Sequence, residues 1–214
     1  MRHHVVVSRL RGFSKPISST AGAETTSTTL TWWALAMITH PESQKRAQVE
    51  LDKVVGRSRT PSFSDAPSLP YIQAIIKEVL RWRPSLPLGA PHNTTEDDWY
   101  DGMFIPKGTM CLVNLWQCHR DPAFYGDDAE KFNPERFLDA NGGVVPGPAE
   151  TREEGHSAYG FGRRACVGRH VANESLFLAI ATVLWAVNLE RDRDQSGEDV
   201  PLDTETFVDT GVFL

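Results

Sequence analysis

The 214-residue sequence lacks a long hydrophobic run, a cysteine framework and an excess of positive charge. Its longest apolar run, residues 176–187, is shorter than the stretch of about 20 residues that spans a bilayer, so no transmembrane helix is expected. Three cysteines are too few, and odd in number, for a disulfide scaffold, and they suggest a reducing compartment or one special thiol. The net charge of −6 argues against nucleic acid as a partner.

Acidic residues are also absent from the first 23 positions, whose charged residues are Arg2, Arg9, Arg11 and Lys15. Such a stretch is faintly similar to a transit peptide, but it has no apolar segment of the length that a secretory signal needs. We favour a chain start without a fold of its own. Residues 1–19 therefore stay unassigned and are expected to be irregular.

What the sequence does contain is an ordinary globular composition, with 40% hydrophobic and 23% charged residues. Apolar spacing and helix boundaries predict helices at residues 20–38, 41–55, 70–83 and about 171–189. Pro41 and Pro70 suit the first turn of a helix, where a missing N–H leaves no hydrogen bond unmade. The first helix after Leu30 and the whole last helix are apolar on nearly all sides, so both are expected to be buried.

Strand signals lie between the third and the last of these helices. Turn sequences at residues 101–102 and 106–108 flank residues 103–105, and residues 110–113 continue as an expected strand. Residues 139–158 form a long polar loop, which in a compact domain is usually functional or disordered. The expected fold class is mainly α with a small antiparallel β-sheet.

The most informative stretch runs from Tyr159 to Gly168 and reads YGFGRRACVG. The spacing of Gly160 and Gly162 superficially fits a dinucleotide fingerprint, but the residues before it are too polar for the strand that this fingerprint requires. We interpret the stretch as a glycine-rich loop that presents Cys166 just before a buried helix. The neighbouring arginines and the N–H groups of the helix start favour a thiolate there, and a thiolate suits an iron ligand.

Two other interpretations of Cys166 stay open at this point. An isolated cysteine is most often a buried structural residue, although the surrounding glycines and arginines favour a functional one. Zinc is the second possibility, because Cys111, Cys118, His119 and His170 are also ligand types. No pair among them has the spacing of a structural zinc site, which makes this the weakest hypothesis.

Three further motifs say little when each is taken alone. Glu78 and Arg81 lie three residues apart on the polar side of a helix, where a surface ion pair contributes little stability. Residues 134–137, PERF, could form a simple turn. Residues 21–26 read AGAETT and would lie within a helix. Threonine hydroxyls in a helix commonly form hydrogen bonds with backbone carbonyls of the preceding turn. Gly22 within that helix lowers its stability and hints at the close approach of a ligand.

Taken together, the motifs resemble the cytochrome P450 superfamily in their order and separations. The segments that carry the resemblance are residues 21–26 (oxygen-activating part of the distal helix), 78–81 (Glu-x-x-Arg), 134–137 (the segment whose arginine joins that pair) and 159–168 (cysteine-ligand loop). Tyr159 stands where most members have Phe. Residues 91–98 and 104–108 further resemble fungal microsomal members. The resemblance implies a partial cytochrome P450 fold, from the distal helix to the cysteine-ligand loop and the following helix.

The resemblance also implies a cofactor, haem b. Cys166 would be the metal ligand, as the proximal thiolate of the haem iron. Arg164 and His92 would bind the haem propionates, because an arginine suits forked contacts with a carboxylate. Three further residues would complete the cofactor-binding loop, and these are Gly162, Gly168 and Tyr159.

Two other groups of residues receive roles by the same resemblance. Glu24 and Thr25 would be catalytic and would supply protons during oxygen activation. Glu78, Arg81 and Arg136 would form a buried ion-pair cluster behind the cysteine-ligand loop, and its role would be structural.

The implied activity is a haem-thiolate monooxygenase that inserts one atom of dioxygen into a small apolar organic substrate. Its electrons would come from NADPH through NADPH–cytochrome P450 reductase, and its location would be the cytoplasmic face of the endoplasmic reticulum membrane. The resemblance covers residues 20–208 and corresponds to the C-terminal half of a family member. Residues 20–214 are thus expected to be the C-terminal part of a cytochrome P450 domain, in a truncated chain without a membrane anchor. The alternative is a haem-binding remnant or fragment without catalytic activity.

Overall fold

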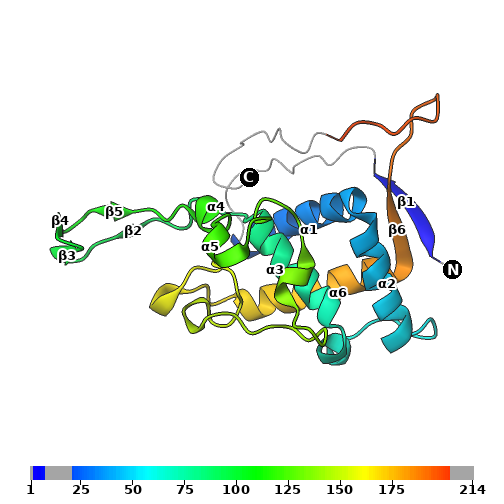
Figure 1. The fold of residues 1–214 in the computed structure, drawn as a ribbon, viewed down its shortest axis with the longest axis horizontal. Helices are drawn as coiled ribbons and strands as arrows, with labels where there is room; N and C mark the ends of the chain where they lie inside the picture. Colours follow the sequence, from blue (N-terminus) through cyan, green and yellow to red (C-terminus); the bar gives the residue numbers. More distant parts are fainter. Residues whose placement is uncertain (1, 8–20, 203–214) are drawn as a thin grey trace.

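A computed structural model of the chain describes residues 2–7 and 21–202. At its centre lie four helices, each of which contacts the other three (Figure 1). They are α1 (Ala21–Thr39), α2 (Pro41–Val54), α3 (Pro70–Trp82) and α6 (Arg169–Ala186). All four helices predicted from the sequence are present, and the expected mainly helical fold class is confirmed.

The start of α3 is fixed by its own sequence and by α2. Pro70 occupies the first turn, where no N–H is needed. The Glu50 carboxylate of α2 accepts hydrogen bonds from the backbone N–H groups of Tyr71 and Ile72, at 3.0 and 3.2 Å. These N–H groups have no partner within α3, and a carboxylate at a helix start also interacts well with the helix dipole. The apolar face of α3 then enters the core with Ile72, Ile75 and Val79 fully buried.

The two apolar helices differ in how completely they are buried. In α1, Trp33 and residues 35–38 are buried, as expected. In α6, one stripe is buried, formed by Leu176, Phe177, Ile180, Ala181 and Leu184. Val171 on α6 is 69% exposed. The expectation that α6 is buried on nearly all sides is therefore wrong for the described residues, which pack against one of its faces only.

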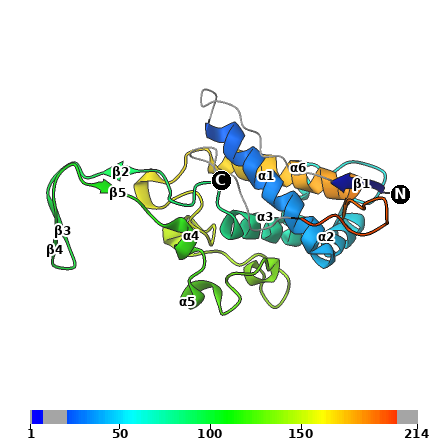
Figure 2. The ribbon, with the colours of Figure 1, turned by 90° about the horizontal axis from the view of Figure 1, so that it is seen from above.

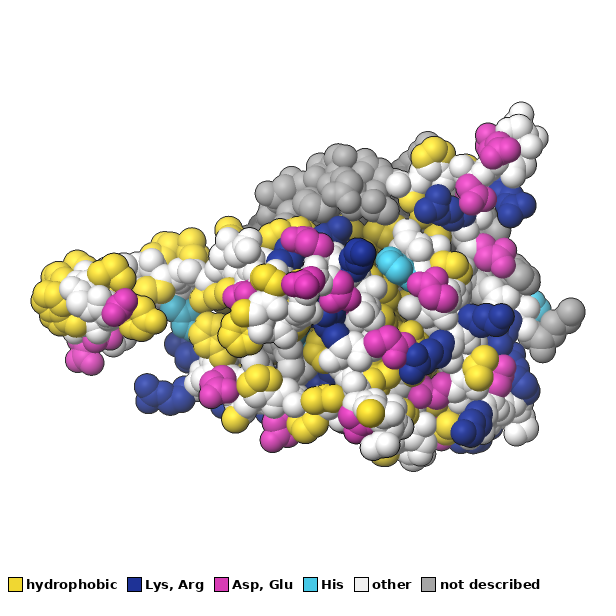
Figure 3. Space-filling view, in the orientation of Figure 1, with side chains coloured by type: hydrophobic (Ala, Val, Ile, Leu, Met, Phe, Trp, Pro, Cys, Tyr) yellow, Lys and Arg dark blue, Asp and Glu magenta, His cyan; other side chains and the backbone are white. Residues whose placement is uncertain are grey.

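Two short antiparallel pairs form a ribbon that extends away from the helices in both views (Figures 1 and 2). Strand β2 (His92–Asn93) pairs with β5 (Met110–Cys111), and β3 (Asp98–Tyr100) pairs with β4 (Met103–Ile105). The expected antiparallel strands are present, although β5 is shorter than residues 110–113. Hydrophobic side chains gather at the tip of the ribbon (Figure 3), where Trp99 is 67% exposed.

A parallel pair at the other end of the molecule was not expected. Strand β1 (His3–Val7) pairs with β6 (Val187–Arg191), which continues directly from α6. The side-chain amide of Gln44 in α2 anchors β6 by donating to the Leu189 carbonyl at 3.0 Å and accepting from its N–H at 2.7 Å. The expectation of an irregular start therefore does not hold for residues 3–7, and residues 8–20 lie outside the described part.

The remaining elements are short turns of helix that connect these parts. They are η1 (Phe63–Ser68), α4 (Leu115–Cys118), α5 (Pro122–Tyr125), η2 (Pro134–Phe137), η3 (Ala149–Thr151) and η4 (Gly162–Arg164). Within residues 2–7 and 21–202, no helix combines the length and the apolar character that crossing a membrane requires.

Candidate functional site

The loop that carries Cys166 is shaped by glycine and by backbone hydrogen bonds. Gly160 and Gly162 have φ values of +70° and +60°, a region that other residues rarely adopt. The N–H of Cys166 donates to the Tyr159 carbonyl at 2.8 Å, which closes the loop on itself. Helix α6 follows, with Gly168 as the residue before its first turn. The sequence thus places the thiol at a fixed point just before a long helix.

The surroundings of this thiol are open and apolar. Cys166 is exposed, which excludes the interpretation of a buried structural cysteine. Its neighbours Phe161 and Val167 are also exposed, Val167 at 95%. An added Cβ at Gly162 would meet no atom within 4 Å, so the described protein leaves space above the loop. An exposed thiol flanked by uncovered apolar side chains fits a flat apolar group with a metal ion at its centre.

Between α3 and η2, the structure brings together Glu78, Arg81 and Arg136. Arg81 forms a bidentate ion pair with the Glu78 carboxylate, with Nε–Oε2 and Nη2–Oε1 distances of 2.7 and 2.8 Å. Arg136 Nε donates to Glu78 Oε1 at 3.2 Å, and the N–H of Asn133 donates to the same oxygen at 2.7 Å. The side chains of Glu78 and Arg81 are completely buried. The contacts expected among these three residues are therefore present.

The remaining donors of Arg81 are also satisfied. Nη1 donates to the carbonyls of His119 and Ala129 at 2.6 and 2.7 Å, and Nη2 donates to that of Lys131 at 3.0 Å. All five N–H groups of the guanidinium thus have an acceptor. A buried charge is stable only when it is paired and hydrogen-bonded in this way, so the cluster holds α3 and the segment around η2 in one arrangement.

Sequence analysis missed the part that His119 plays in this region. The residue follows α4, is fully buried, and lies with Nδ1 2.9 Å from the Arg81 carbonyl. Its Nε2 accepts the N–H of Ser157 at 2.9 Å. Both ring nitrogens are therefore engaged by backbone groups, which removes His119 from the zinc hypothesis. Within residues 2–7 and 21–202, no three His, Cys, Asp or Glu side chains gather as a metal site would require.

The Tyr159 hydroxyl joins the loop to α6. It donates to Asn173 Oδ1 at 2.7 Å, and the Asn173 amide donates to the Glu154 carboxylate at 3.0 Å. Glu154 in turn lies 3.7 Å from Lys77 Nζ of α3. Burial raises the pKa of Tyr159, so the phenol stays protonated and remains a donor. A phenylalanine at this position could not make the first link.

Replacing Tyr159 by phenylalanine is expected to lower the free energy of unfolding by about 1 kcal/mol, because Asn173 loses its donor while the ring packing is kept. Urea unfolding followed by tryptophan fluorescence measures the difference. Tyr100 is 70% exposed on β3, and the matched change Tyr100→Phe is expected to alter stability by less than about 0.5 kcal/mol. Equal effects of the two changes would contradict the role given to the Tyr159 hydroxyl.

The residues expected to be catalytic lie in the first turns of α1. Glu24 and Thr25 are partly exposed. The Thr25 carbonyl accepts from the Ser85 hydroxyl at 3.1 Å, and Ser85 also contacts the Thr29 hydroxyl at 3.2 Å, which attaches α1 to the segment after α3. An added Cβ at Gly22 would meet nothing within 4 Å. Packing among the described residues therefore does not explain why position 22 is a glycine. The close approach of a ligand there stays a prediction.

The two residues expected to bind propionates lie on separate elements. His92 is exposed on β2, and Arg164 is exposed in η4. Among the described residues, no hydrogen bond or ion pair joins His92 or Arg164 to Cys166 or to each other. Both side chains are thus accessible to a ligand, but the protein alone does not assemble them into one site.

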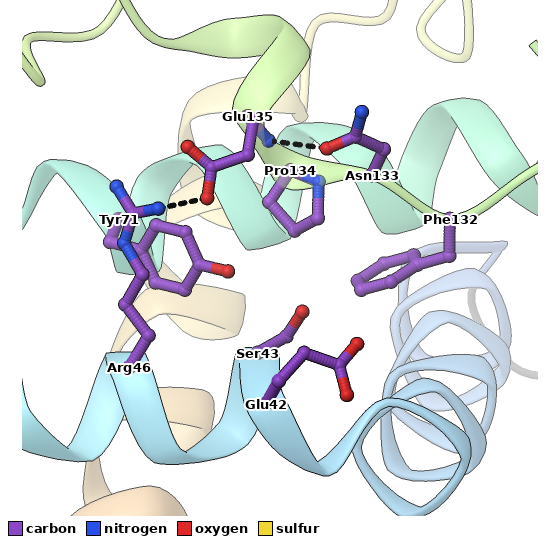
Figure 4. A pocket seen from close by; sticks show the side chains of 8 residues that line it. All are labelled: Glu42, Ser43, Arg46, Tyr71, Phe132, Asn133, Pro134 and Glu135. Atoms are coloured by element: carbon purple, nitrogen blue, oxygen red, sulfur yellow. Dashed lines mark hydrogen bonds and ion pairs between the residues drawn. The ribbon is translucent and has the colours of Figure 1, made fainter. Parts of the chain in front are cut away.

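A cleft of about 340 Å³ lies elsewhere, between α2, α3 and the stretch formed by the start of η2 and the two residues before it (Figure 4). Arg46 closes one side of it by pairing with Glu135 and by lying 4.2 Å above the Tyr71 ring. None of the residues predicted for catalysis, cofactor binding or the ion-pair cluster lines this cleft. Its cation Arg46 is already engaged by Glu135 and Tyr71, and we assign no function to the cleft.

Comparison with known proteins agrees with this arrangement. The family model described as "Cytochrome P450" matches residues 18–208. A cytochrome P450 monooxygenase of Armillaria gallica is 60% identical over 192 residues, which is 90% of this chain and 37% of that protein. Cytochrome P450 monooxygenase 58 of Postia placenta is 50% identical over 90% of the chain and 36% of its own length. Cytochrome P450 monooxygenase iboC of Amanita muscaria is 43% identical over 90% of this chain and 42% of its own length.

The chain therefore spans well under half the length of these relatives. The matched region includes the exposed cysteine loop, the buried ion-pair cluster and the first turns of α1, which are the features that the structure places around α3 and α6. A family match over nearly the whole chain, together with this geometry, leads to one conclusion. The chain belongs to the cytochrome P450 family.

Proposed function

We propose that the chain is the cysteine-ligand part of a haem-thiolate monooxygenase. The observation that carries this proposal is the exposed Cys166 thiol, presented by a glycine loop and flanked by uncovered apolar side chains. Cys166 would hold the iron of haem b, and Gly162 and Gly168 would let the loop approach the flat ring. Arg164 and His92 would bind the propionates, for which their exposed cationic or donor groups are suited.

When bound, haem supplies the oxygen-activating redox chemistry, and a thiolate ligand favours cleavage of the O–O bond. The protein's contribution is to hold Cys166 at a fixed point just before α6, in a loop closed by the hydrogen bond from the Cys166 N–H to the Tyr159 carbonyl. The buried cluster of Glu78, Arg81 and Arg136 supports the loop from behind and takes no part in the reaction.

Glu24 and Thr25, in the first turns of α1, would supply protons during oxygen activation. Their position is maintained by the hydrogen bond between Ser85 and the Thr25 carbonyl. The substrate would be a small apolar organic molecule, and one of its C–H groups would receive one oxygen atom while the other atom leaves as water. Two electrons would come from NADPH through NADPH–cytochrome P450 reductase. The location would be the cytoplasmic face of the endoplasmic reticulum membrane, a proposal that rests on the resemblance to microsomal members.

Haem titration of three proteins tests this proposal: the wild type, Cys166→Ser and Cys118→Ser. Cys118 is also exposed but has no glycine beside it and Arg120 as its one nearby arginine, so it is the matched control. The reduced, CO-treated wild type and Cys118→Ser are expected to show the spectrum of a thiolate ligand, and Cys166→Ser is expected to lose it. A thiolate spectrum retained in Cys166→Ser and lost in Cys118→Ser would overturn the assignment. Thiolate-ligated haem without substrate-dependent NADPH consumption would favour the remnant over the monooxygenase.

A further inference from the structure

We propose that His119 is a positioning residue that holds the Cys166 loop in place by linking it to the last turns of α3. The link rests on two hydrogen bonds of one ring, from Nδ1 to the Arg81 carbonyl at 2.9 Å and from the Ser157 N–H to Nε2 at 2.9 Å. A carbonyl can only accept and a backbone N–H can only donate. The proton must therefore sit on Nδ1 and the lone pair on Nε2. The neutral Nδ1–H form of His119 satisfies both bonds, and no other form does.

Arg81 and His119 are joined in both directions. While the His119 ring donates to the Arg81 carbonyl, the Arg81 guanidinium donates to the His119 carbonyl at 2.6 Å. The ring is thus attached to the residue that anchors the buried cluster with Glu78. Because the cluster has one arrangement, the Nε2 atom that faces Ser157 is held in a fixed place.

From Ser157 the connection continues into the cysteine loop. The Ser157 carbonyl accepts the N–H of Gly160 at 2.8 Å, and the Tyr159 carbonyl accepts the N–H of Cys166 at 2.8 Å. Hydrogen bonds, the His119 ring and short stretches of backbone thus connect Arg81 with Cys166. We infer that the His119 ring sets where the loop sits relative to α3, and with it the place of the thiol.

The charged and titratable groups around the ring favour its neutral form. Arg81 faces it from α3 and Arg120 from the following residue, while the rings of Tyr125 on α5 and His156 on the loop lie 6.2 and 6.3 Å away between centroids. Among residues 2–7 and 21–202, the charges that act on the ring are those of these two arginines, and no carboxylate there stabilises a protonated ring. These surroundings therefore favour the neutral ring over the protonated one.

Three variants separate the two hydrogen bonds. The amide of Asn reaches the place of Nδ1, so His119→Asn keeps the bond to Arg81 and loses the acceptor for Ser157. The longer Gln places its amide oxygen near Nε2, so His119→Gln keeps that acceptor. Leu51→Ala, in the core of α2 and away from the loop, serves as a control for a general loss of stability.

Backbone hydrogen exchange of the full chain at neutral pH is the measurement. The amides of Ser157, Gly160 and Cys166 are expected to exchange about tenfold faster in His119→Asn than in the wild type, the effect of one lost hydrogen bond, and to recover in His119→Gln. In Leu51→Ala, the exchange rates of these three amides are expected to change no more than the rates of amides in the core. Equal rates in His119→Asn and the wild type, or no recovery in His119→Gln, would overturn the proposal.

A second readout concerns the haem and rests on the proposed function. The thiolate-type fraction of the CO spectrum is expected to fall in His119→Asn and to return in His119→Gln. A wild type that never shows a thiolate spectrum would refute the proposed function, while the exchange rates would still decide the role of His119. A full thiolate fraction in His119→Asn would show that this residue does not position Cys166.

Discussion

Replacing Arg81 by methionine is expected to lower the free energy of unfolding by about 3–5 kcal/mol, because it leaves a charged group buried without its main partner. Glu78 would lose both bonds of the bidentate pair, with only Arg136 and one backbone N–H remaining. The backbone carbonyls of His119 and Ala129 would lose their Arg81 donor as well, while the Lys131 carbonyl would keep Arg136 Nη2 at 3.4 Å. Urea unfolding followed by tryptophan fluorescence measures the loss.

An exposed arginine provides the matched control. Arg193 lies 3.4 Å from Asp199, with both side chains more than half exposed, and Arg193→Met is expected to cost about 0–1 kcal/mol. The double change Glu78→Gln with Arg81→Met is expected to cost less than the sum of the two single changes, since no charge then stays buried without a partner. An Arg81→Met variant as stable as Arg193→Met would contradict the structural role of the cluster.

Acid is expected to destabilise the folded chain through its buried histidines. Burial lowers the pKa of His119 from 6.5 to about 4, against the opposing effect of its hydrogen bond to the Arg81 carbonyl. Burial also lowers the pKa of His156, with further contributions from His119 and Lys77. Between pH 6.5 and about 4, the unfolded chain binds a proton on His119 that the folded chain does not. The contribution of His119 is thus complete above pH 6.5 and is lost as the pH falls toward 4.

The expected loss from His119 over this interval is about 3 kcal/mol, from about 1.4 kcal/mol for each unit of pKa shift. Unfolding free energies measured from pH 7 to pH 4 give the slope. His119→Asn has no titrating ring at this position, so its stability is expected to fall less steeply than that of the wild type. Parallel curves for the two proteins would show that the ring is not held in its neutral form.

Structural features that are set by residues close together in the sequence could be predicted from the sequence. The helices follow from apolar spacing and proline positions within single segments, and the turn before β4 follows from residues 101–102. Helical periodicity alone would place Glu78 and Arg81 in solvent, because they lie off the apolar face of α3. Only the resemblance predicted their contact with Arg136, which comes from a segment more than 50 residues away.

Features that depend on distant partners could not be found in this way. Strand β1 exists through parallel pairing with β6, about 180 residues later in the chain, and a three-valine run gives too little signal for it. The role of His119 depends on backbone groups of Arg81 and Ser157, each 38 residues away. No spacing within one sequence marks such a link. Burial of α6 was overestimated because composition shows how apolar a helix is, and not how many of its faces are covered.

The central claim is that Cys166 is the thiolate ligand of a haem iron, in a loop held by the buried cluster behind it. The most direct test is resonance Raman spectroscopy of the haem-loaded chain, prepared with cysteine enriched in a heavy sulfur isotope. In the double variant Cys111→Ser with Cys118→Ser, Cys166 is the remaining cysteine. The account predicts an iron–sulfur stretching band that shifts with the isotope in this variant as it does in the wild type. A band that is absent from the double variant, or that persists in Cys166→Ser, would contradict the account.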